Sequence, residues 1–368
     1  MKKIYLLFCL FVVTQLNAQI PLTTVPDGGN KKASVSEWIG LTEVRIDYSR
    51  PGVKGREGKI WGDLVHYGLG DLGFGNTKQA PWRAGANENT TISFSNDVKI
   101  NGQQLVAGKY GFFIIYDSIF CTLIFSKNNS SWGAFYYEPS EDALRIKVKP
   151  SKLDQSIEWL QFNFINQTSN TATVSLEWEK LQIAFTVEAD YIRDQLNSFR
   201  KELRSERGFI WQAWNQAAQW CVQNNVNLDQ ALVWADTATS ATFGGQNSFQ
   251  AWTTKSQILQ KLNRSDEAFS TMQKILPTAG IFEVHQYARQ LIGLKLYKQA
   301  LDVFKMNYEK HPNTFTTLVG MTRGLSATGE YDKALTYARQ ALELAPDPAN
   351  KINVEGMIKK LKDRKDVN

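Results

Sequence analysis

Hydrophobic and polar residues alternate along the first half of the chain. Over residues 32–188 the apolar positions repeat every two residues, the period of a strand that is buried on one side. The pattern is clearest over residues 144–149 and 174–179. Asn101 and Gly102 lie between two short apolar runs and predict a tight hairpin turn, because both tolerate a positive φ angle. Roughly nine short antiparallel strands at this spacing predict a β-sandwich or a jelly-roll-like domain.

The second half of the chain repeats at helical spacing to its last residue. An alanine within a short charged and apolar element recurs at Ala231, Ala268, Ala300 and Ala334, with separations of 37, 32 and 34 residues. A tetratricopeptide repeat is a helix–turn–helix unit of about 34 residues, so this half resembles an array of such repeats. The resemblance implies an α-solenoid whose concave surface binds a protein partner.

The change of period near residue 187 divides the chain into segments. We expect a signal peptide over residues 1–18, a β-sandwich domain over 19–187, a linking helix over 188–207, tetratricopeptide-like repeats over 208–348 and a basic C-terminal helix or tail over 349–368. The last segment holds six Lys and Arg against three acidic residues, and we interpret it as a solvated helix.

The first 18 residues have the features of a secretory signal peptide. Lys2 and Lys3 precede an apolar run over residues 4–13, and the small residue Ala18 stands before Gln19. The run is too short to span a bilayer, which needs about 20 apolar residues, and no later segment comes closer. We therefore expect a periplasmic or secreted protein without a transmembrane segment, and association with the cell envelope stays open.

Composition argues against a nucleic-acid partner and against a fold held by disulfides. The chain carries 42 Lys and Arg against 36 Asp and Glu, a formal net charge of +6, and these charges are interleaved. Because no dense basic stripe appears, the sequence does not indicate a nucleic-acid partner. The cysteines Cys9, Cys121 and Cys221 are too few for a disulfide framework. Whether Cys121 pairs with Cys221 stays open.

The β half resembles a bacterial family catalogued only as domain of unknown function 2911, over about residues 33–187. Two departures from the family pattern are visible: His66 stands where such proteins usually carry proline, and residues 69–81 insert a glycine-rich loop. The family has no established activity, so the resemblance implies export and leaves the function open. The segments that carry the resemblance are 48–56, 61–62, 64–68, 82–91, 97–98 and 107–110.

The segment from Trp82 to Glu88 is the main candidate for chemistry. It places an aromatic ring, a cation, a carboxamide and a carboxylate within seven residues. These groups either face a polar ligand or hydrogen-bond one another to lock a loop against the sheet, as buried polar groups require. We take Trp82, Arg83, Asn87 and Glu88, together with Tyr67 of the preceding motif, as a candidate binding set.

Other charged residues suggest weaker alternatives. Arg50, Lys54 and Arg56 flank a proline and two glycines, and they form either an anion cradle or a solvated turn. The usual phosphate-loop spacing is missing from this segment.

His66 lies near Asp63 and Asp71, but zinc sites normally recruit three or four suitable ligands, and the histidine count is three for the whole chain. The glycine-rich run over residues 68–75 lacks the strand–turn–helix context of a dinucleotide site. We therefore expect no metal and no cofactor.

Two functions compete at this point. The first is an exported interaction or scaffold protein whose repeats bind a protein partner while the β domain binds an unknown second component. The alternative is a carbohydrate-directed or other hydrolytic enzyme that uses Glu88 with Asp63 or Asp71. Only analogy between β-sandwich folds supports the enzyme, so we regard catalysis as the less favoured reading.

Cleavage after Ala18 is the first testable prediction. The exported form should begin at Gln19, because Ala18 is the small residue that ends the apolar region. Mass spectrometry of protein recovered from the periplasm or medium measures its N-terminus directly. A mature chain that retains Met1 would contradict the export argument.

Overall fold

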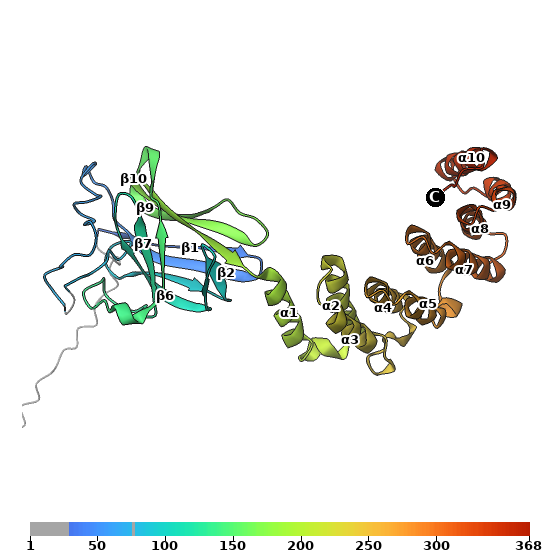
Figure 1. The fold of residues 1–368 in the computed structure, drawn as a ribbon, viewed down its shortest axis with the longest axis horizontal. Helices are drawn as coiled ribbons and strands as arrows, with labels where there is room; N and C mark the ends of the chain where they lie inside the picture. Colours follow the sequence, from blue (N-terminus) through green and yellow to red (C-terminus); the bar gives the residue numbers. More distant parts are fainter. Residues whose placement is uncertain (1–28, 76–77) are drawn as a thin grey trace, which may run out of the picture. The chain divides into compact units, whose positions relative to one another are not determined.

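A computed structural model describes residues 29–75 and 78–368, which form two compact units with a boundary between Gln195 and Leu196 (Figure 1). The predicted signal peptide over residues 1–18 lies outside the described residues. Strand β10 runs to Ala189, and helix α1 covers Tyr191–Glu202, so the boundary falls within this helix. Each unit is described separately below.

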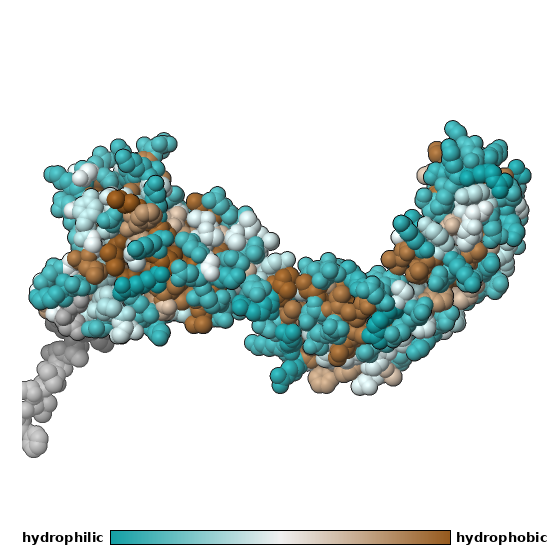
Figure 2. All heavy atoms as spheres, in the orientation of Figure 1, coloured by the Kyte–Doolittle hydropathy of each residue, from teal (hydrophilic) through white to brown (hydrophobic). Residues whose placement is uncertain are grey.

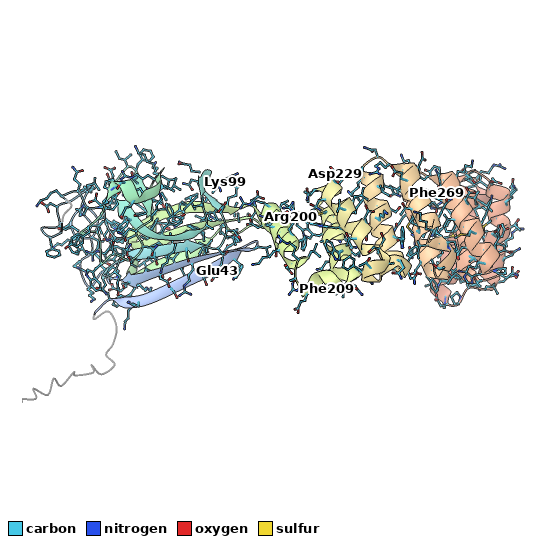
Figure 3. All side chains as sticks on the ribbon, turned by 90° about the horizontal axis from the view of Figure 1, so that it is seen from below. Glu43, Lys99, Arg200, Phe209, Asp229 and Phe269 are labelled. Atoms are coloured by element: carbon cyan, nitrogen blue, oxygen red, sulfur yellow. The ribbon has the colours of Figure 1, made fainter. Side chains whose placement is uncertain are left out.

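The first unit consists of two antiparallel sheets, which confirms the predicted β fold. The six-stranded sheet has the order β1 (Lys31–Ile39), β2 (Thr42–Arg50), β3 (Thr90–Phe94), β6 (Gly108–Ile115), β7 (Cys121–Ser126) and β8 (Asp142–Val148). The four-stranded sheet has the order β5 (Gln103–Leu105), β4 (Val98–Ile100), β10 (Thr171–Ala189) and β9 (Ser151–Ile165). Figure 3 labels one residue from each sheet, Glu43 on β2 and Lys99 on β4.

One hydrophobic core joins the two sheets. Phe185 of β10 meets Phe112 of β6 at 5.7 Å and Phe125 of β7 at 5.6 Å between ring centroids. All three rings are almost fully buried. Aromatic side chains remove large areas from water, so these contacts between facing sheets stabilise the sandwich.

The predicted hairpin is confirmed. Strands β4 and β5 pair directly across Asn101 and Gly102, whose φ angles are 47° and 82°. Positive φ at both central positions matches a tight turn whose twist suits the flanking strands.

Strand β10 contains an irregularity that the alternation alone did not predict. Val174, Leu176 and Trp178 face the core, and so do Ile183, Phe185 and Val187, yet the two sets are out of phase by one residue. The register with β9 shifts on both sides of Glu179, whose φ angle is 50°. The shift in register returns the second set to the core, as a β-bulge does.

The second unit is built from helix pairs, which confirms the predicted solenoid. In each pair the recurring alanine lies fully buried in the second helix, at positions Ala231, Ala268, Ala300 and Ala334. A methyl side chain lets the helices of a pair approach closely, which explains the repeat period. The pairs are α2 (Trp211–Asn224) with α3 (Leu228–Ala238), α4 (Phe249–Lys261) with α5 (Ser265–Gln273), α6 (Ile281–Gly293) with α7 (Tyr297–Lys310), and α8 (Phe315–Ala327) with α9 (Tyr331–Glu343).

Figure 1 shows α2, α4 and α6 on the inner side of this curved array and α3, α5 and α7 on the outer side. Asp229 and Phe269, labelled in Figure 3, belong to the outer helices α3 and α5. The described chain also forms short 3₁₀ turns at Pro139–Glu141, Glu206–Phe209, Ala241–Phe243, Gly245–Asn247 and Leu276–Thr278.

The C-terminal segment is not a solvated helix on all sides, so that interpretation was wrong for one face. Helix α10 (Pro348–Lys362) buries three apolar residues against the repeat core, Val354, Met357 and Leu361. After the helix, Val367 is also buried, and Ser326 of α8 donates a 2.7 Å hydrogen bond to Asp366. The basic side chains of the helix remain exposed, which accounts for its polar appearance in sequence.

The buried His285 of α6 makes the stability of the repeat unit depend on pH. Burial, together with the nearby positive charges of Arg323 and Arg289, lowers the pKa of His285 from 6.5 to about 4. Between these two values the unfolded chain binds a proton that the folded chain does not. Acidification through this window should therefore remove up to about 3 kcal/mol of stability.

Denaturant unfolding of the whole chain at about pH 7 and about pH 4.5 measures this loss. We expect His285→Gln to flatten the pH dependence of the repeat-unit transition, whereas His311→Gln, at a half-buried position, leaves it unchanged. The same slope in both variants and the parent would show that His285 is not the responsible group.

Candidate functional site

Trp82 belongs to a cluster of three indole rings inside the β unit. Its backbone exchanges two hydrogen bonds with Ile114 of β6, at 2.9 and 2.8 Å, which fix the segment against the sheet. The ring stacks on Trp178 of β10 with centroids 6.1 Å apart and an interplanar angle of 17°. Trp61 meets Trp82 edge-on at 5.5 Å. The cluster thus joins segments that are far apart in sequence.

Arg83 and Asn87 hold the loop that follows Trp82. Arg83 Nη1 donates a 2.7 Å hydrogen bond to the Asn87 carbonyl oxygen, and its guanidinium lies over the Phe135 ring at 5.1 Å. Gly133 makes room for this guanidinium, since a Cβ there would meet Arg83 Cζ at 2.5 Å. Asn87 has a φ angle of 56° and accepts a hydrogen bond from Asn30. These contacts support the loop-locking alternative for both residues.

A pocket of about 350 Å³ opens beside the same residues. We call it the indole pocket and define it by the six lining residues Arg56, His66, Trp82, Arg83, Asn87 and Trp178. Its described lining contains two arginines and no Asp or Glu. Burial lowers the pKa of Arg83, and within the described chain no carboxylate forms an ion pair with it. The volume suits a small molecule.

Two nitrogen atoms of the lining residues lack hydrogen-bond partners within the described part of the chain, and both are closed off from solvent. They are Nε1 of Trp178, a residue that is 1% exposed, and Nδ1 of His66. Buried polar atoms are normally paired, so both require an explanation. Sequence reasoning missed Trp178 because it fits the strand alternation as an ordinary core residue. His66 drew attention only as a metal candidate and as a departure from the family pattern.

Glu88 does not share this pocket, although it follows Asn87 directly. It lines a separate pocket of about 560 Å³, together with Lys32 and Asp47. Lys32 Nζ lies 2.8 Å from Glu88 Oε1, and this hydrogen bond lowers the pKa of Glu88. The predicted set is therefore divided between two places in the β unit.

Tyr67 lines neither pocket and is 56% exposed, with its ring stacked on Tyr116 at 5.3 Å. The two carboxylates considered as partners of Glu88 also lie elsewhere. Neither Asp63 nor Asp71 lines its pocket, and Asp71 pairs with Lys78 at 3.1 Å. This placement gives the hydrolytic alternative no second carboxylate from that pair.

The basic residues near the start of the β unit serve the backbone. Arg50 donates to the Leu160 carbonyl oxygen at 2.7 Å, and Arg56 donates to those of Val53 and Gly52. Neither an anion cradle nor a freely solvated turn describes these two side chains.

Among the described residues, no group of three or more His, Cys, Asp and Glu side chains could hold a metal ion. Cys121 and Cys221 are buried and free. No described helix has both the length and the apolar character needed to cross a membrane.

A third pocket, of about 440 Å³, lies on the inner side of the repeat unit, lined by α2, α4 and α6. We call it the glutamine groove, because five of its lining residues are glutamines. They are Gln219, Gln250, Gln257, Gln286 and Gln290. Phe282 also lines it and is 69% exposed. The sequence gives no sign of this groove, since isolated glutamines disturb neither the helical period nor the charge pattern.

Comparison with known proteins supports both halves of the fold. Residues 30–187 match a family described as a protein of unknown function (DUF2911), and residues 287–347 match a tetratricopeptide repeat family. Both resemblances found in the sequence are thereby confirmed. They define a two-part protein, an antiparallel β domain followed by a tetratricopeptide-type array. No curated protein matches the chain.

Several solved structures are similar to the repeat half. YrrB, titled a TPR protein with an unusual peptide-binding site, is 18% identical, covering 47% of this chain and 87% of its own, with a TM-score of 0.30. MamA from Desulfovibrio magneticus RS-1 is 13% identical over 44% of this chain and 96% of its own, with a TM-score of 0.29. Similarity at this level carries no functional argument.

The divided site gives a prediction for two neighbouring positions. Arg83→Ala should lower the unfolding free energy of the β unit by about 1–3 kcal/mol, because it leaves the Asn87 carbonyl without its donor. Glu88→Ala should stay within about 0.5 kcal/mol, since the Lys32–Glu88 pair lies at the surface. Denaturant unfolding measures both values. Equal destabilisation by the two changes would contradict the assignment of Arg83 to loop locking.

Proposed function

We propose that this chain is an exported protein-interaction protein. Its repeat unit binds an extended segment of a protein partner in the glutamine groove, and its β unit holds a second component. The tetratricopeptide-type fold supports the first part. The charged, apolar and small residues at positions 1–18 support export.

The unpaired carboxamides of the groove carry the proposal. Within the described chain, none of the five glutamine side chains forms an intramolecular hydrogen bond. A carboxamide has both a donor and an acceptor, so it can pair with the N–H and C=O groups of an extended peptide. Gln250 and Gln257 are two helical turns apart on α4, while Gln286 and Gln290 are one turn apart on α6. This spacing places each pair on one helix face.

Phe282 adds an apolar contact to this polar groove. An exposed aromatic ring beside hydrogen-bonding groups is a common anchor for a partner chain. The described lining contains no Lys or Arg, and its one carboxylate, Glu283, already accepts a 2.8 Å hydrogen bond from the Gly280 backbone. Figure 2 shows apolar atoms gathered over the first helices of the array. The groove therefore favours main-chain and apolar contacts over charge.

Peptide selection tests this proposal. Linear peptides selected from a displayed random library against the whole chain should bind Gln286→Ala and Gln257→Ala about 2- to 12-fold more weakly per change, the equivalent of one hydrogen bond. Phe282→Ala should weaken binding about tenfold or more. Fluorescence polarisation with the selected peptide measures each affinity.

Gln340→Ala provides the matched control, because Gln340 is exposed on the second helix α9, outside the groove. Selected peptides that bind the three groove variants as tightly as the parent would place recognition elsewhere and contradict the proposal.

A further inference from the structure

The indole pocket combines features that together specify a ligand. Trp82 is partly exposed in the lining, with the buried Trp178 stacked against it, so the lining offers one indole side chain to a flat apolar group. Leu64, Val65 and Leu72 add aliphatic surface to the lining. A ligand body without charge would fit this part of the pocket.

The polar part of the pocket consists mainly of donors. The N–H of Trp178 is closed off from solvent, so the donor that a ligand meets is the guanidinium of Arg83. Arg83 is half-buried, and the described lining has no carboxylate to balance its positive charge; Arg56, which also lines the pocket, donates to backbone carbonyl oxygens. A buried charge without a counterion is costly, so an anionic acceptor would stabilise this arrangement.

We propose that the indole pocket binds a small organic carboxylate with a flat apolar body. The carboxylate meets the Arg83 guanidinium, and the apolar body lies against the indole surface of Trp82. This inference rests on the proposed role of the β unit in holding a second component, and it names the chemical class of that component. A carboxylate accepts several hydrogen bonds at once, which suits a site with several donors.

The larger pocket at Glu88 is less suited to an anion than the indole pocket. Its lining contains Lys32 and Lys109 together with Asp47 and Glu88, and Lys32 already pairs with Glu88. Charges of both signs are present there, so that pocket has no excess of unpaired donors that would select an anion.

Calorimetric titration of the whole chain tests the inference with three probes: naphthoate, its neutral amide naphthamide, and acetate. Naphthoate should bind, and naphthamide should bind at least about tenfold more weakly, because it lacks the charge. Acetate should show no measurable binding, because it lacks the flat body. Equal binding of naphthoate and naphthamide, or no binding of naphthoate, would overturn the proposal.

Two variants localise the binding. Trp82→Leu removes the indole surface and keeps an apolar side chain, so it should weaken naphthoate about tenfold; Trp38→Leu, at a 63% exposed position outside the pocket, should not. Because Trp82 also packs against Trp61 and Trp178, Leu64→Asp provides a second test at a 49% exposed lining position. It should weaken naphthoate and spare naphthamide, whereas Leu41→Asp, outside the pocket, should affect neither.

Unchanged naphthoate affinity in Leu64→Asp would overturn the assignment to this pocket. The peptide affinity of the same protein, measured in parallel, separates this outcome from the proposed function. Loss of the carboxylate claim with peptide binding intact would leave the role of the repeat unit standing. Naphthamide binding as strong as that of naphthoate would overturn the claim that the ligand is a carboxylate. It would still agree with a β unit that holds a second component.

Discussion

The core of the β unit depends on a β-bulge in one strand, which brings two sets of apolar side chains to the same face. Strand β10 has 19 residues and pairs with β9 along one part and with β4 near its end. A regular strand would turn Ile183, Phe185 and Val187 away from the core that Val174 and Leu176 enter, because side chains alternate with a period of two. The bulge at Glu179 prevents this. The left-handed backbone of Glu179 is accompanied by a 2.6 Å hydrogen bond from the Gly58 backbone to its carboxylate.

The same bulge determines the candidate site. Trp178 directly precedes Glu179 and forms one wall of the indole pocket, while the bond to Gly58 fixes the loop that carries Trp61 beside it. Interruption of regular pairing is a common way for proteins to aim a side chain at a binding site. Arg83, which also lines the pocket, holds the loop after Trp82 through its hydrogen bond to the Asn87 carbonyl oxygen. The pocket thus depends on the bulge that keeps the apolar side chains of β10 in the core.

The sequence predicted the elements whose pattern is local. Alternation indicated the strands, Asn101 and Gly102 indicated their hairpin, and the buried alanines indicated the helix pairs, because each depends on residues close together in the chain. The bulge could have been suspected from the change of phase between Trp178 and Ile183. The residues of β9 that pair on each side of the bulge could not be predicted, because the register depends on the sequence of β9 as well.

The site was less predictable, because it joins distant segments. The loop from Trp82 was chosen for its chemical variety, but neighbouring residues can face opposite ways, which is why Asn87 and Glu88 line different pockets. Trp178 and His66 meet only through the fold. The glutamine groove draws on three helices, and nothing in the sequence distinguished its carboxamides from other exposed polar side chains.

The central claim is that the repeat unit recognises its partner through the inner helices. Hydrogen–deuterium exchange of the whole chain, with and without a selected peptide, tests this most directly. The account predicts added protection in α4 and α6, over Phe249–Lys261 and Ile281–Gly293, with the β unit unchanged. Protection confined to the outer helices α5 and α7, or to the β unit, would contradict it.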